Sequence, residues 1–197
     1  MMRKKRQLSA EFPTVEQLET ELAREKYRRR YGKVLRSTLY TLITVAAVAV
    51  LVATLWLPVL QIYGSSMTPT LSEGEIVVSW KGSDFHRGDI IAFYYNNKIL
   101  VKRVIAGPGQ WVDIREDGTV YVDGDQLDEP YLTEKAMGDC DIRLPYQVPD
   151  GRYFVMGDHR STSVDSRHSA VGCVAGEQIV GKIAFRIWPM NEFGRVD

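Results

Sequence analysis

The chain has 197 residues, of which 45% are apolar, and this length allows one domain of ordinary size with appendages. Residues 1–36 contain eleven Lys and Arg against five Glu, a net charge of +6, so residues 37–197 carry −6 within a formal total of zero. A nucleic-acid-binding protein would carry its basic patch on the folded domain. The charge distribution therefore excludes nucleic acid as a partner and indicates a membrane protein with a basic cytoplasmic end.

Two cysteines, Cys140 and Cys173, are present without the close paired spacing of zinc ligands. We expect no metal site and no cofactor. A disulfide between them is possible if the C-terminal region lies outside the cytoplasm. Sequence separation does not give the distance between two Cα atoms, so a disulfide and two unpaired thiols both stay open.

The first predicted element is a helix. Thr14 and Gln17 have the spacing of a capping box, and residues 16–36 are rich in good helix formers. The segment ends in a basic cluster typical of a membrane-surface anchor that faces anionic lipid headgroups. The cluster comprises Arg28, Arg29, Arg30, Lys33 and Arg36.

An uncharged run from Ser37 to Ser72 follows. Its most apolar part, Leu39 to Leu60, would span about 33 Å as a helix, enough to cross a hydrocarbon core of ~30 Å. Pro58 is expected to loosen or end the helix. A cleavable signal peptide is the competing interpretation, but its apolar region would be shorter and would lie near the N-terminus. A retained anchor is favoured, with the N-terminus inside because Lys and Arg crowd that flank.

We therefore expect a cytoplasmic basic segment (1–36), a single transmembrane anchor (37–62) in the cell membrane, and an extracytoplasmic domain (63–197). Short β-branched and aromatic runs separated by turn residues predict that this domain is all-β. Asn96-Asn97 and Asp117-Gly118 predict hairpin turns. The predicted strands cover residues 75–80, 89–95, 99–105, 111–115, 119–122, 152–156 and 178–188.

The stretch Gly64–Leu71, just beyond the predicted anchor, holds Ser66 among small residues. A serine in such a turn can be approached closely by a substrate backbone. The stretch predicts either a nucleophile turn or a polar linker that leaves the membrane.

Lys102 lies in the predicted strand 99–105, where both faces are otherwise largely apolar. One interpretation is a lysine whose amine reaches water along apolar neighbours. The other is a desolvated lysine with a lowered pKa, which supplies a neutral amine as general base and activates a serine without histidine.

A third polar cluster runs from Gly157 to Arg167 and contains His159. An exposed turn and an ordered polar loop are both compatible with its composition. A Ser-His-Asp triad of Ser66 with His159 and Asp158 or Asp165 is conceivable, but one histidine in a charged loop is more often structural or exposed.

Four motifs occur in order and at suitable spacing. They are Gly64–Leu71, Arg87-Gly88-Asp89, Val101-Lys102-Arg103 with Gly107-Pro108-Gly109, and Gly157-Asp158 with Ser163-Val164-Asp165-Ser166-Arg167. Together with the preceding anchor, over residues 38–188, they resemble the conserved boxes of the bacterial type I signal peptidases. The resemblance implies a mainly β protein, in which an all-β catalytic domain of coiled antiparallel sheets follows one N-terminal transmembrane helix.

The resemblance also implies roles for individual residues. Ser66 is the nucleophile and Lys102 the general base of a Ser/Lys dyad. Ser163 orients the lysine amine, and Asp165 and Arg167 brace the site. The backbone N–H of Ser66 holds the oxyanion with a second donor, which is left open because Gly64 stands where some members carry a serine. His159 stands where asparagine is frequent, which we interpret as local variation.

By the same resemblance, the function is that of a membrane-anchored serine endopeptidase that removes signal peptides from secretory pre-proteins through an acyl-enzyme. The expected partners are those signal peptides and the lipid bilayer. Shallow pockets near Ser66 would select small residues. The expected contacts with substrate and membrane are Ile62, Met67 and Leu71.

Two alternatives stay open. One is a sortase-like cysteine transpeptidase built from Cys173, His168 and Arg186. The other is a non-catalytic anchored β-domain in secretion, against which an intact Ser66 and Lys102 argue.

Overall fold

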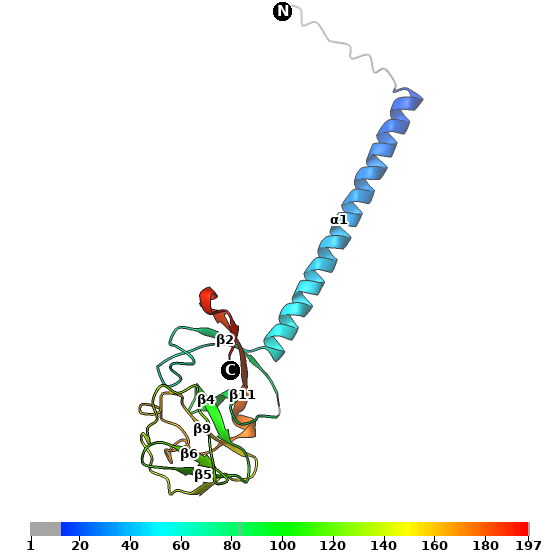
Figure 1. Cartoon of the computed structure of the whole chain (residues 1–197). Coiled ribbons are helices and arrows are strands. Elements are labelled where there is room, and N and C mark those ends of the chain that lie inside the picture. The colour runs from blue at the N-terminus through cyan, green and yellow to red at the C-terminus, as the bar shows by residue number, and fades with distance from the viewer. Residues whose placement is uncertain (1–12, 83, 197) are drawn as a thin grey trace, which may run out of the picture. The chain divides into compact units, whose positions relative to one another are not determined.

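The structure is a computed structural model that describes residues 13–82 and 84–196. It divides into two units after Leu51, which are described separately below (Figure 1). The first twelve residues of the expected basic segment lie outside the described residues.

Helix α1 extends from Val15 to Trp56 without interruption. The predicted capping box is present, because Thr14 N–H donates to Gln17 Oε1 over 3.0 Å and Gln17 N–H donates to Thr14 Oγ1 over 3.4 Å. By length and composition α1 can cross a membrane. None of its residues is buried against protein, so its apolar half needs an apolar environment such as lipid.

Helix α1 ends two residues before Pro58, as the missing N–H of proline requires. The carbonyl of Pro58 accepts the N–H of Ser79 over 2.9 Å. The chain then continues as strand β1 (Val59–Gln61), which pairs antiparallel with β2 (Ile76–Trp80). Residues 59–61 are therefore strand, although they lie within the span 37–62 that the sequence predicts as membrane anchor.

The larger sheet has eight strands in the order β1-β2-β11-β3-β4-β9-β10, with β12 paired to β11. All of the pairings are antiparallel. Its remaining strands are β3 (Ile90–Tyr95), β4 (Lys98–Ala106), β9 (Arg152–Met156), β10 (Val174–Ala175), β11 (Ile179–Trp188) and β12 (Gly194–Arg195). Two short 3-10 helices, η1 (Gly176–Gln178) and η2 (Met190–Glu192), flank β11.

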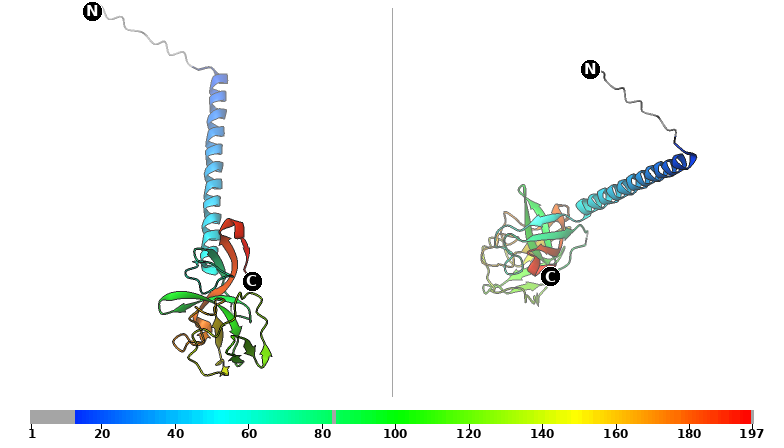
Figure 2. Two further views of the ribbon diagram at one scale, coloured as in Figure 1. Left: turned by 60° about the vertical axis from the view of Figure 1, so that its left-hand side comes forward. Right: turned by 90° about the horizontal axis from the view of Figure 1, so that it is seen from above.

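A smaller antiparallel sheet has the order β7-β6-β5-β8. Its strands are β5 (Trp111–Ile114), β6 (Val120–Val122), β7 (Asp125–Gln126) and β8 (Tyr146–Gln147). It packs its buried face against Phe154 and Met156 of β9. Figures 1 and 2 show β5 and β6 at one end of the β-unit and β2 with β11 at the other.

The predicted fold class is confirmed, and every predicted strand is present within one or two residues. The strands that the sequence did not predict, β1, β7, β8, β10 and β12, have two or three residues each. Such short strands carry no periodicity and form because a longer neighbour offers its edge.

Strand β4 positions the site. It pairs with β3 over Lys98–Arg103 and with β9 over Arg103–Ala106. Lys102 and Arg103 are both 3% exposed, so two adjacent cations are buried on opposite faces of one strand.

Candidate active site

The structure brings Ser66 and Lys102 together from two segments 36 residues apart. The Nζ atom of Lys102 donates to Oγ of Ser66 over 2.6 Å. Ser66 lies in a compact turn in which Thr68 N–H donates to Ser65 O and Leu71 N–H donates to Met67 O. Lys102 is therefore a buried lysine aimed at a serine, and its amine does not reach outward to water.

Burial lowers the pKa of the Lys102 ammonium from 10.5 to about 8, because desolvation disfavours the charged form. The negative charges of Asp165 and Asp158 act in the opposite direction, and Arg167 adds to the lowering. Near neutral pH a usable fraction of this amine is unprotonated. A primary amine beside a hydroxyl can then accept its proton.

The polar loop 157–167 is ordered and largely buried. Asp165 and Arg167 form an ion pair of 2.8 Å with neither side chain exposed. Desolvation acts to raise the pKa of Asp165, but the hydrogen bonds and charge of Arg167 outweigh it and keep that pKa below its usual range. Asp165 also accepts the N–H of Gly157 over 2.9 Å, so the pair fixes the start of the loop.

Ser163 is buried in this loop next to Gly157. Within the described part of the chain its Oγ has no hydrogen-bond partner, so the expected bond to the Lys102 amine is not made in this structure. A β-carbon added at Gly157 would lie 2.2 Å from Oγ of Ser163 and 2.5 Å from the carbonyl oxygen of Ser66. The loop therefore packs directly against the turn that carries the serine.

His159 supports the serine turn through its backbone. Its N–H donates to the carbonyl of Ser66 over 3.1 Å, and its Nδ1 lies 3.3 Å from Oγ1 of Thr68. Oγ of Ser66 is thus hydrogen-bonded to Lys102, whereas the ring of His159 contacts Thr68. The geometry does not form a Ser-His-Asp triad.

Gly64 has φ of +80°, a conformation that side chains rarely adopt, which accounts for glycine at this position. The backbone N–H of Ser66 is donated to no acceptor among the described residues. It is available to an oxyanion. No side-chain donor comes from position 64.

A cavity of about 660 Å³ opens beside the two residues. It is lined by residues 59–64, by Ser66 and Met67, and by Lys98–Lys102. Beyond Arg103, β4 pairs with β9, but no described strand pairs with that edge of Lys98–Lys102. The cavity is therefore a groove with open strand edges.

The structure corrects the expected membrane contacts. Ile62, Met67 and Leu71 are 4%, 2% and 0% exposed and belong to one core cluster with Val77 and Ile183. An apolar side chain next to a membrane anchor is compatible with core and with lipid contact, and here all three side chains attach the serine turn and the residues before it to the core. Ile62 and Met67 still line the groove, whereas Leu71 does not.

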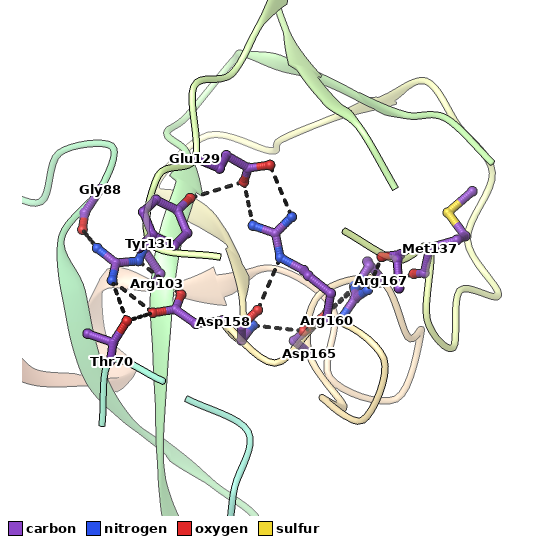
Figure 3. Close-up of polar contacts among 12 residues, drawn as sticks. Thr70, Gly88, Arg103, Glu129, Tyr131, Met137, Asp158, Arg160, Asp165 and Arg167 are labelled. Atoms are coloured by element: carbon purple, nitrogen blue, oxygen red, sulfur yellow. Dashed lines mark hydrogen bonds and ion pairs between the residues drawn. The ribbon is translucent and has the colours of Figure 1, made fainter. Parts of the chain in front are cut away.

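The sequence did not predict the contacts among three residues, Thr70, Asp158 and Arg103, which connect the serine turn, the polar loop and β4 (Figure 3). Arg103, next to Lys102, forms a buried ion pair with Asp158, in which Nε lies 2.9 Å from Oδ1 and Nη2 2.8 Å from Oδ2. Asp158 accepts the hydroxyl of Thr70 over 2.5 Å. The signal available in the sequence was Arg103, a second charge next to Lys102 in an otherwise apolar strand. A buried arginine requires a partner.

Both cysteines are free. Burial raises the pKa of the Cys173 thiol to about 11, which is opposite to what a nucleophilic cysteine needs. Arg186 is engaged elsewhere, since its guanidinium binds Thr70 O over 2.6 Å and pairs with Glu75 and Glu192. The cysteine transpeptidase alternative is not favoured.

Comparison with known proteins agrees with this geometry. The family model "Signal peptidase, peptidase S26" matches residues 35–188. The chain belongs to the peptidase S26 family of signal peptidases. Signal peptidase IB of Staphylococcus aureus (strain COL) is 41% identical over 153 residues, which cover 67% of this chain and 78% of that protein.

Signal peptidase I of Bacillus licheniformis is 37% identical over 147 residues, covering 68% of this chain and 78% of that protein. A crystal structure of a signal peptidase I from Enterococcus faecalis V583 is 32% identical, with a TM-score of 0.41 over 50% of this chain and 96% of that one. As an S26 member the chain is a peptidase and hence a hydrolase. The matched range contains the serine turn, β4 and the polar loop.

Proposed function

We propose that this chain is a membrane-anchored serine endopeptidase that removes signal peptides from secretory pre-proteins, with Ser66 as nucleophile and Lys102 as general base. The 2.6 Å contact between Lys102 Nζ and Ser66 Oγ is the observation that carries the proposal. Names of relatives support the substrate class, because they are signal peptidases I and IB.

In the first step the neutral amine of Lys102 takes the proton of the Ser66 hydroxyl as Oγ attacks the carbonyl carbon of the scissile peptide. The negative charge that forms on the carbonyl oxygen is stabilised by the N–H of Ser66. When the carbon–nitrogen bond breaks, the Lys102 ammonium returns the proton to the leaving amine of the mature protein. An ester of Ser66 with the signal peptide remains.

In the second step Lys102, neutral again, takes a proton from a water molecule that attacks the ester. Collapse of the second tetrahedral intermediate releases the carboxylate of the signal peptide and returns the proton to Ser66. Asp165 and Arg167 hold the polar loop in place throughout. Ser163, whose buried Oγ has no hydrogen-bond partner among the described residues, is proposed to orient the amine.

We propose that the substrate binds as an extended strand in the groove between residues 59–64 and Lys98–Lys102. Open strand edges favour such binding because they donate and accept main-chain hydrogen bonds. The groove is lined mainly by apolar residues, including Ile62, Leu100 and Val101. Such a lining suits the small apolar side chains expected near the cleavage site.

The proposal places residues 1–36 in the cytoplasm, the uncharged part of α1 (residues 37–56) across the bilayer and the β-domain outside. The density of Lys and Arg on the N-terminal flank supports this orientation. Exposed aromatic and apolar side chains on β2, β11 and η2 would contact the bilayer, because such side chains suit a membrane interface. These are Trp80, Phe185, Trp188 and Met190.

The test uses the full chain in detergent with a peptide that carries a signal-peptide cleavage site. Ser66→Ala and Lys102→Ala should each reduce cleavage by on the order of 10⁴-fold or more, as loss of a nucleophile or its base does in other serine peptidases. The melting temperature of Ser66→Ala should stay close to wild type.

Cys173→Ala is the matched control, since the thiol has no role in the proposal. Cleavage by the Ser66→Ala variant at more than a few per cent of the wild-type rate would contradict the dyad. Loss of cleavage in the Cys173→Ala variant, with its fold intact, would favour a cysteine enzyme.

A further inference from the structure

The segment between β7 and β8 crosses the β-domain beside the polar loop, and its sequence shows no periodicity. Residues 129–138 of it are called the clamp segment here. The carboxylate of Glu129 is fully buried, and the main chain at Ala136 packs so closely on the β5–β6 turn that a β-carbon at Gly118 would lie 2.4 Å from Ala136 N. The clamp segment is thus fixed to the smaller sheet.

At its first residue the clamp segment holds the polar loop. Glu129 accepts from both terminal nitrogens of Arg160, and neither side chain is exposed. The Nε of Arg160 donates in turn to the carbonyl of Gly157 over 3.1 Å. Gly157 is the residue that packs against the Ser66 carbonyl. A displacement of Glu129 would therefore reach the serine turn through three successive contacts, by way of Arg160 and Gly157.

Tyr131 connects the same carboxylate to β4. Its hydroxyl donates to Oε1 of Glu129 over 3.0 Å, and its ring lies 3.9 Å from Cζ of Arg103 (Figure 3). Arg103 follows Lys102 in the chain and binds Asp158. A cation over an aromatic ring is attracted to its face, and more strongly when both are desolvated. Tyr131 thus joins the lysine strand to the carboxylate that holds the loop.

The other end of the clamp segment holds the end of the loop. The carbonyl of Met137 accepts from Nη1 of Arg167 over 2.6 Å. A β-carbon at Gly138, which has φ of +65°, would lie 2.4 Å from Arg160 O and 2.6 Å from Arg167 Nη1. The segment therefore contacts both arginines of the loop and the arginine of β4.

We propose that the clamp segment is a positioning device for the dyad, in which Glu129 and Tyr131 hold β4 and the polar loop in the relative position that brings the Lys102 amine to the Ser66 hydroxyl. A fully buried Glu–Arg pair is a poor way to gain stability, because desolvation offsets most of its attraction. A role in positioning β4 and the polar loop relative to each other explains the buried Glu129–Arg160 pair better. The inference rests on the proposed Ser/Lys chemistry.

The positioning role has a measurable signature. The charged groups that act on the Lys102 amine are Asp165, Arg167 and Asp158, all of which the clamp segment contacts directly or through one residue. If the loop moves relative to β4, the distances from these charges to the amine change. The pH at which cleavage reaches half its plateau should then shift, which a loss of global stability alone would not cause.

Tyr131→Phe removes one hydroxyl and keeps the ring, and Glu129→Asp shortens the carboxylate by one methylene. Both are made in the full chain and assayed in detergent for kcat, KM, pH profile and melting temperature. We expect kcat to fall about tenfold for each, with KM within about twofold and the half-plateau pH shifted by about half a unit or more. Glu129→Gln should lower kcat further. If that variant fails to fold, the kinetics of Tyr131→Phe decide whether the positioning role holds.

Val174→Ala is the control, because it opens a core cluster that contains no residue of the clamp segment. It should lower the melting temperature and leave kcat and the pH profile unchanged. Clamp variants that behave like Val174→Ala would overturn the positioning role. Ser66→Ala is assayed in parallel: residual cleavage there would refute the dyad itself, whereas an inactive Ser66→Ala with wild-type kinetics in the clamp variants would refute only the clamp.

Discussion

The hydroxyl of Thr70 donates to the Asp158 carboxylate over 2.5 Å, which attaches the end of the serine turn to the start of the polar loop. Asp158 in turn binds Arg103, the neighbour of Lys102 in β4. Ser66 and Lys102 are therefore connected in two ways: directly by their hydrogen bond, and through Thr70, Asp158 and Arg103. Both connections act on the distance between the proposed nucleophile and its proposed base.

Thr70→Val keeps the shape of the side chain and removes the donor. A buried carboxylate that loses one hydrogen bond costs about 1–3 kcal/mol, so the melting temperature should fall. The turn is then less firmly held, and small displacements of reacting groups slow a reaction strongly. We therefore expect kcat to fall about tenfold or more. Thermal unfolding and peptide cleavage measure the two effects.

Thr162→Val provides the comparison, since Thr162 is exposed in the same loop. It should change neither stability nor kcat. Wild-type kcat in Thr70→Val would contradict the idea that this bond holds the serine turn in place.

Gly157→Ala introduces a methyl group where no space exists, 2.2 Å from Oγ of Ser163 and 2.5 Å from the Ser66 carbonyl. Overpacking of this kind costs about 1–3 kcal/mol. Because one of the displaced groups belongs to Ser66, the proposed nucleophile, cleavage should be lost almost completely even in the folded fraction. Circular dichroism and single-turnover cleavage separate folding from chemistry.

At Gly107 the nearest atom to an added β-carbon is 3.8 Å away, so Gly107→Ala should be tolerated and serves as control. An active Gly157→Ala variant would mean that the loop retreats freely from the serine turn.

Cleavage should depend on pH through Lys102, whose pKa is lowered to about 8. The base must be neutral, so kcat/KM should rise with pH up to a plateau above about pH 9 and fall about tenfold per unit below pH 7. Lys102→Arg keeps a cation that does not lose its proton in this range, and it should be inactive at every pH. A flat wild-type profile down to about pH 5 would exclude a lysine base.

The same lysine should limit stability. Its folded-state pKa lies below the unfolded value of 10.5, so the buried charge carries its full penalty below about pH 8, and the penalty disappears as the pH rises from 8 to 10.5. At about 1.4 kcal/mol per pKa unit this amounts to about 3 kcal/mol. Lys102→Met should therefore be more stable than wild type at pH 7, by urea denaturation, and the difference should shrink as the pH rises from about 8 to 10.5. An equal or lower stability at pH 7 would contradict a desolvated ammonium.

The local sequence singles out Ser66 and Lys102 as candidates but leaves two interpretations for each, and only the four motifs in order select between them. Ser66 stands in a small-residue turn after an apolar run, and Lys102 interrupts an apolar strand. Short β-branched and aromatic runs between turn residues also predict most of β2, β3, β4 and β11, since this composition is visible in a single segment.

Glu129 and Tyr131 have no local signature of this kind. Their partners lie 31 and 28 residues away, on Arg160 and Arg103, and nothing in an aperiodic loop indicates which carboxylate will be buried. Leu71 shows the opposite difficulty: its apolar character is obvious, but the sequence does not distinguish a core position from a lipid-facing one.

Cys140 lies in the chain two residues beyond the clamp segment and is partly exposed, whereas the only other cysteine is buried. Its neighbour Asp141 accepts the N–H and hydroxyl of Ser169 and donates its own N–H to Arg167 O. A thiol reagent should modify Cys140 in the folded state, whereas the rate at which it modifies the buried Cys173 should follow transient opening of the core cluster around it. The chain carries a native reporter from which the free energy of that opening can be obtained without introducing a label.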